Sequence, residues 1–177
     1  GLIIANMQDV ENPELFAVMS NYPQAGYNHS GWWNERGDRY YLADETHGTD
    51  IKIVDVSDIR NPRVIQLIEA ESDPEGSIVH NLIVKNDMLY VSYYFDGLQV
   101  FDVSGDTSTC WAYNYPTSEL EPRRGGFGGA WGVYPLLPSG RVIVSDMQNG
   151  MFLIEIPQLQ PSDTSGVEGT RPCQPEL

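Results

Sequence analysis

Two histidines open similar stretches of the chain, His29 in YNHSGWW and His80 in IVHNLIV. Imidazole nitrogens bind transition metals, and Asp44, which opens the loop after the second strand of the repeat that contains His29, could add a carboxylate oxygen. The sequence therefore predicts a channel-lining metal site of His29, His80 and Asp44, with further ligands from elsewhere in the fold. The alternative, which the sequence alone favours, is that each histidine hydrogen-bonds the backbone or channel water where strands converge.

A third histidine, His47, lies in the acidic turn DETHGTD, residues 44–50. Calcium prefers oxygen ligands, and Asp44, Glu45 and Asp50 could supply them there. The spacing of an EF-hand is absent from this turn. A solvated turn without an ion is the alternative interpretation.

No set of residues for nucleophilic catalysis emerges from the sequence. Ser30, Ser92 and Ser145 do not lie in a G-x-S-x-G motif, which would place a serine on a sharp turn between a strand and a helix. The sequence thus favours a protein that is not an enzyme. A metal-dependent enzyme that uses the two histidines is the alternative.

An internal repeat of about 50 residues defines the elements that would position these histidines. DIKIVDVSDIRNPRVIQLI (50–68) aligns with GLIIANMQDVENPELFAVM (1–19) at an offset of 49 residues. LYVSYYFDGLQVFDV (89–103) aligns without a gap with VIVSDMQNGMFLIEI (142–156). In the same register, His29, His80 and Trp131 occupy equivalent places.

Each repeat is typical of four short antiparallel strands separated by turns. The dipeptides at 96–97 (DG) and 149–150 (NG) predict tight type I′ hairpins before the third strand, because both residues tolerate positive φ. Four-stranded units of this length are the blades of a β-propeller, in which the first strand of each blade lines the central channel. Equivalent histidines on neighbouring first strands should therefore both approach the channel axis at the same end.

The predicted fold is all-β, a β-propeller with about three and a half four-stranded blades. The blades fall near residues 1–20, 26–70, 77–115 and 129–157, which together form a partial propeller over 1–157. Since closed propellers have roughly four to eight blades, we expect missing sequence or another chain to complete the ring. Residues 158–177 are rich in Pro, Ser and Gly and are predicted to form a C-terminal tail.

Composition excludes several classes of partner. The formal net charge is −15, which repels phosphate backbones and anionic lipid, so nucleic acid is not an expected partner. No apolar run reaches the roughly 18 residues of a membrane span, so this segment is not expected to insert in a membrane. Cys110 and Cys173 lack metal-site spacing and could pair in an oxidising compartment.

Three stretches, YNHSGWWNERGDRYYLADE, HNLIVKNDMLYVSYYFDGLQVFDVS and GAWGVYPLLPSGRVIVSDMQNG, resemble the C-terminal half of LVIVD-repeat proteins of the choice-of-anchor B type. IKIVDVSDIRNP resembles the repeat itself, and the likeness covers roughly residues 1–157. The resemblance implies an extracellular, cell-surface or periplasmic location, a ring with further blades, and no established catalytic residues. The expected function is therefore that of an exported binding or structural module, with a protein partner or second chain completing the ring.

Overall fold

The computed structural model describes residues 1–70, 76, 78–105, 110–115 and 127–156, with side chains omitted for 110–114. The regular elements within these ranges are thirteen β-strands. No described segment forms a helix that is long and apolar enough to cross a membrane. The all-β prediction is therefore confirmed over the described residues.

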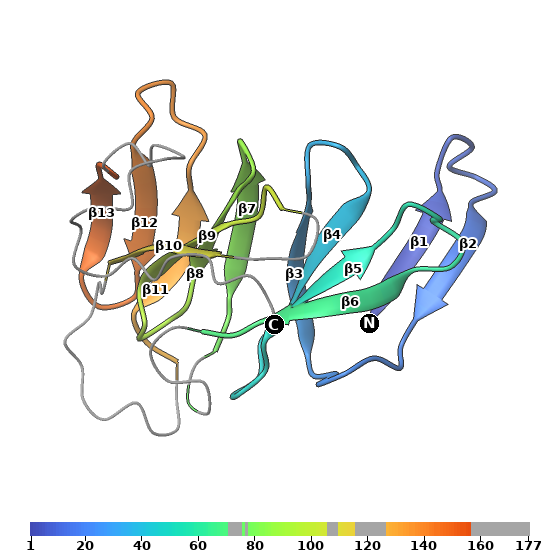
Figure 1. Ribbon diagram of the computed structural model, residues 1–177, viewed down its shortest axis with the longest axis horizontal. Helices are drawn as coiled ribbons and strands as arrows, with labels where there is room; N and C mark the ends of the chain where they lie inside the picture. Colours follow the sequence, from blue (N-terminus) through green and yellow to red (C-terminus); the bar gives the residue numbers. More distant parts are fainter. Residues whose placement is uncertain (71–75, 77, 106–109, 116–126, 157–177) are drawn as a thin grey trace.

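The strands form four antiparallel sheets that follow one another across the molecule in chain order (Figure 1). The first sheet pairs β1 (Leu2–Asn6) with β2 (Glu14–Met19). The second contains β3 (Asn28–Trp33), β4 (Arg39–Asp44), β5 (Ile51–Asp55) and β6 (Arg63–Ile68). The third contains β7 (Asn81–Lys85), β8 (Met88–Ser92), β9 (Leu98–Asp102) and β10 (Cys110–Tyr115), and the fourth contains β11 (Ala130–Tyr134), β12 (Val142–Asp146) and β13 (Gly150–Ile154).

Apolar side chains fill the space between each sheet and the next. Strand residues alternate between two faces, so a sheet covered on both sides needs apolar residues at successive positions. This explains the uninterrupted burial of the first four residues of β5 and of β9. Three core clusters result, and they lie between sheets one and two (Leu2, Met19, Leu42, Val54), two and three (Tyr41, Ile53, Leu89, Val91), and three and four (Leu98, Val100, Val142, Val144).

The tight turns differ from the prediction in type and place. Type I′ geometry needs positive φ at both central residues, and it occurs at Asn86 (52°) and Asp87 (56°), which join β7 directly to β8. At 96–97 and 149–150 only Gly97 and Gly150 have positive φ, so the predicted type I′ turns at these two places are wrong. The chain uses longer loops there, and Asp146 closes one of them by accepting from the backbone N–H groups of residues 148 and 149.

Candidate metal site

His29, Glu45 and His80 converge at one place, although they come from three separate segments. His29 lies in β3, Glu45 directly follows β4, and His80 directly precedes β7. Their ligand atoms all lie within 4.8 Å of one another. Nδ1 of His29 is 3.6 Å from Oε2 of Glu45, and Nε2 of His80 is 3.8 Å from Oε1 of the same carboxylate. The carboxylate thus faces both imidazoles, whose ring centroids are 4.4 Å apart.

His80 is held in one tautomer by Trp131 of the next sheet. Its Nδ1 lies 2.5 Å from the backbone oxygen of Trp131, which can only accept a hydrogen bond. Nδ1 therefore carries the hydrogen, and the lone pair is left on Nε2, the atom that faces Glu45. Burial lowers the pKa of His80, while the hydrogen bond to the Trp131 carbonyl opposes that shift. A neutral imidazole, 4% exposed and fixed by a backbone carbonyl, is the usual state of a metal-binding histidine.

Tyr94 orients the carboxylate from the other side. Its hydroxyl donates to Oε1 of Glu45, and burial together with this contact raises the pKa of Tyr94, so the phenol stays protonated. The backbone of Tyr94 has a φ of 40°, in the left-handed region that favours glycine. Gly129 packs against the Tyr94 carbonyl so closely that a Cβ would overlap it. Strained and closely packed backbone of this kind often surrounds functional sites.

The first strands of three successive sheets are joined by one repeated contact. Ser30 and Asn81 each directly follow a histidine of the cluster. The hydroxyl of Ser30 donates to the backbone oxygen of His80 (2.5 Å), and the amide of Asn81 donates to that of Trp131 (3.3 Å). Ser92 is a third donor to the Trp131 oxygen, at 2.8 Å, beside Asn81 and Nδ1 of His80. These contacts fix the spacing between the two histidines.

Asp44, a predicted metal ligand, points away from the histidines. Both Asp44 and Lys52 are fully buried, and Nζ of Lys52 lies 2.9 Å from Oδ2 of Asp44. The hydroxyl of Tyr22 donates to Oδ1 (3.0 Å), and the backbone N–H of Gly26 donates to Oδ2 (3.1 Å). The carboxylate is thus already bound to a cation and two hydrogen-bond donors. The structure brings His29 and His80 together but places Glu45, not Asp44, beside them.

The acidic turn does not gather its oxygen atoms around one point. Asp50 exchanges hydrogen bonds with Gln24, and His47 contacts the backbone oxygen of Gly76 at 3.2 Å. Among the described residues, the cluster of His29, Glu45 and His80 is the one group of three or more His, Cys, Asp or Glu side chains close enough to share a metal.

The predicted pairing of Cys110 and Cys173 lies outside the residues whose side chains are described. The predicted tail at 158–177 also lies outside the described residues. Both stay predictions.

Three residues, Glu45, Tyr94 and Trp131, were not predicted as part of the histidine site, and Glu45 was considered only for a separate cation site in the acidic turn. Glu45 is the neighbour of Asp44, and adjacent residues in extended chain point in opposite directions. Lys52 offered a signal, because a lysine in the apolar run IKIV needs a buried anion. Assigning Asp44 to Lys52 would have left Glu45 for the histidines.

Comparisons with known proteins place the chain no more finely than its fold class. No family model matches it, and no curated protein matches it. It is similar to the crystal structure of the computationally designed Ika4 protein, with a TM-score of 0.39 and 9% identity over 80% of this chain and 98% of that chain. The described residues form several small antiparallel sheets, and these comparisons assign the chain to no family.

Proposed function

We propose that the chain is part of a β-propeller and binds a divalent transition-metal ion between His29, Glu45 and His80. The propeller interpretation is supported by the repeat in the sequence and by consecutive sheets that pack face to face. It agrees with the resemblance to LVIVD-repeat proteins. In such a ring, the first strands β3, β7 and β11 line the central channel, and the site lies where they meet.

One observation carries the metal proposal: Nε2 of a neutral, buried His80, the ring nitrogen that bears the lone pair, faces a carboxylate that a second histidine also faces. Zinc, copper, nickel and iron accept this mixture of nitrogen and oxygen ligands. Calcium takes oxygen ligands, and only one of the three side chains offers them. The site therefore favours a transition metal over the calcium alternative.

Metal binding can be measured on tag-free chain 1–177 after chelator treatment, by calorimetric titration with Zn²⁺ and by elemental analysis. We expect one ion per chain. His29→Gln and His80→Gln should each raise the dissociation constant by about 100-fold or more. Loss of a residue that only hydrogen-bonds a metal ligand already lowers metal affinity by roughly 10- to 100-fold.

His47→Gln is the matched control, because His47 is the remaining histidine of the chain and lies outside the cluster. Its affinity for Zn²⁺ should equal that of the unmodified chain. Absence of stoichiometric binding, or equal losses in all three variants, would remove the proposal. Thermal unfolding of each variant separates lost ligation from lost folding.

A second function, that of a structural or protein-binding module, is favoured by the outward faces of the two end sheets. Ile3 and Val18 are paired across β1 and β2, and the side chain of Ile3 is 67% exposed. At the other end, Met151 and Leu153 of β13 are 68% and 55% exposed. Exposed apolar strand faces of this kind mark surfaces that another sheet covers. We propose that further propeller sequence or a second chain covers them.

Sedimentation velocity of the chain tests this second function. The unmodified chain should associate as its concentration rises, whereas Leu153→Lys should remain monomeric. Arg141→Gln is the control. Arg141 directly precedes β12 and forms an exposed ion pair with Glu155, so its replacement does not change the apolar face. A monomer at every concentration would count against the module. An exported or cell-surface location stays a prediction.

A further inference from the structure

The indole of Trp131 occupies the atom of His80 that a metal would need. Nε1 of Trp131 donates to Nε2 of His80 at 2.5 Å, while the backbone oxygen of Trp131 accepts from Nδ1. One residue thus engages both ring nitrogens of His80. The two contacts agree on a single tautomer, because an indole N–H can only donate and a carbonyl can only accept.

A metal and the indole cannot use this nitrogen at the same time. A neutral imidazole has one lone pair in the ring plane, and here it lies on Nε2. The metal would replace the indole N–H as the partner of that lone pair. The backbone oxygen of Trp131 would stay in β11 and keep Nδ1 protonated, so His80 would need no change of tautomer.

Trp131 is the partner that is able to move. It is 53% exposed, whereas His80 is 4% exposed and is tied through its backbone to Ser30. A rotation of the Trp131 side chain toward solvent exposes Nε2 without disturbing the strands. The equivalent places in the two preceding repeats hold His29 and His80, so the third sheet-opening position carries a competitor where the others carry ligands.

We propose that Trp131 is a gate for the metal site: its indole N–H occupies Nε2 of His80 in the empty site and swings out when a metal binds. This inference rests on the proposed metal-binding function. The competing hydrogen bond weakens metal affinity, because it must be broken before the ion can bind. Removing the N–H should therefore tighten binding.

Trp131→Phe tests the gate, since phenylalanine keeps an aromatic ring and the backbone carbonyl but lacks the N–H. With Zn²⁺ as the probe, the dissociation constant of tag-free Trp131→Phe should be about two- to tenfold lower than that of the unmodified chain. This factor corresponds to the net free energy of one ordinary hydrogen bond. Zinc should also shift the tryptophan emission of the unmodified chain to longer wavelength, and the variant should lack this shift. Trp32→Phe removes another exposed tryptophan and should change neither result.

The outcomes separate the gate from the metal site. If neither the unmodified chain nor Trp131→Phe binds Zn²⁺, the metal-binding function fails and the gate with it. If Zn²⁺ binds but Trp131→Phe shows equal or weaker affinity, the gate fails and the metal site stands. Retention of the emission shift in Trp131→Phe would also contradict a movement of this indole. Circular dichroism confirms that each variant is folded.

Discussion

Replacing Lys52 with methionine should destabilise the chain strongly, because it leaves the carboxylate of Asp44 buried without a cation. Both side chains are fully buried, and the Nζ–Oδ2 distance is 2.9 Å. The hydrogen bonds from Tyr22 and Gly26 remain, but neither donor carries a charge. Breaking one side of a buried ion pair costs about 3–5 kcal/mol. For a chain of this size, each kcal/mol lowers Tm by roughly 2–4 °C, so Tm should fall by about 6–20 °C.

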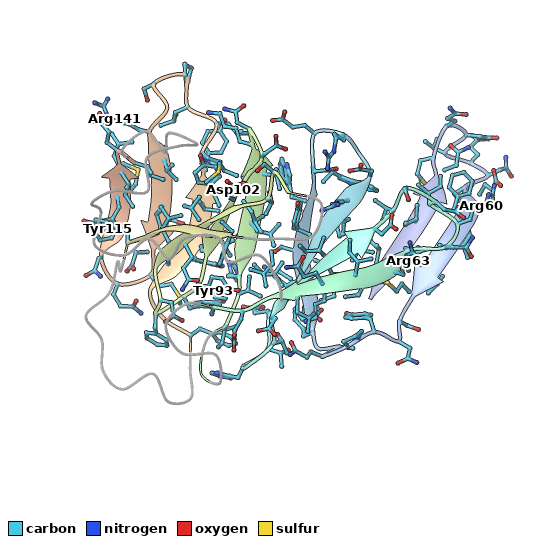
Figure 2. The ribbon with its side chains drawn as sticks, viewed as in Figure 1. Arg60, Arg63, Tyr93, Asp102, Tyr115 and Arg141 are labelled. Carbon is cyan, nitrogen blue, oxygen red and sulfur yellow. The ribbon has the colours of Figure 1, made fainter. Side chains whose placement is uncertain are left out.

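The assay is urea denaturation followed by circular dichroism, with Arg63→Met as the matched control. Arg63 lies on β6 at the surface (Figure 2). Its side chain is 74% exposed, and its Nη2 is 2.9 Å from Oδ2 of Asp55. An exposed pair contributes about 0–1 kcal/mol, so this variant should lose little. Lys52→Met combined with Asp44→Leu should recover part of the loss, since no buried charge remains. Equal effects of Lys52→Met and Arg63→Met would refute the idea of a desolvated pair.

Three further outcomes are expected. Burial and the charge of Asp44 raise the pKa of Tyr22 to about 12, so the folded chain keeps a proton that the unfolded chain releases near pH 10. The free energy of unfolding should therefore fall as pH rises from 10 to 12. In urea titrations Tyr22→Phe should show a shallower fall, and an unchanged slope would contradict this. Gly129→Ala, at φ 91°, should lose more than about 2 kcal/mol by overlap with the Tyr94 carbonyl, measured by thermal unfolding; an unchanged Tm would show that this contact is loose. Glu45→Gln should weaken Zn²⁺ binding by about 100-fold with little change in Tm, and retained affinity would remove the carboxylate from the site.

The repeat in the sequence was enough to locate most strands and to pair His29 with His80. Side chains alternate along a strand, so residues at equivalent places in successive repeats must share a face and a height in their sheets. The two histidines lie 51 residues apart in the chain, yet their rings are 4.4 Å apart in the structure. This part of the site follows from register alone.

The carboxylate of the site could not be chosen in the same way. Asp44 ends β4 and Glu45 follows it, so a shift of one residue decides which of them faces the histidines. That shift depends on a partner on the neighbouring strand β5, Lys52, and not on the local pattern. The type I′ turns predicted at 96–97 and 149–150 were wrong because they too depend on more than the local residues. Gly97 and Gly150 do adopt positive φ, but the loop length between paired strands decides the turn type.

His80 and Trp131 each have two roles: the backbone oxygen accepts a hydrogen bond from the preceding sheet, and the side chain belongs to the cluster. Ser30 binds the backbone oxygen of His80, and Asn81 binds that of Trp131, so the main chain at these positions holds neighbouring sheets together. A carbonyl is present whatever residue supplies it, so the side chains of His80 and Trp131 are not needed to accept these two hydrogen bonds. Substitution of the residue that supplies the carbonyl can therefore alter the side-chain chemistry of the cluster while the hydrogen bond between the two sheets persists. The same joint carries a histidine in one repeat and a tryptophan in the next.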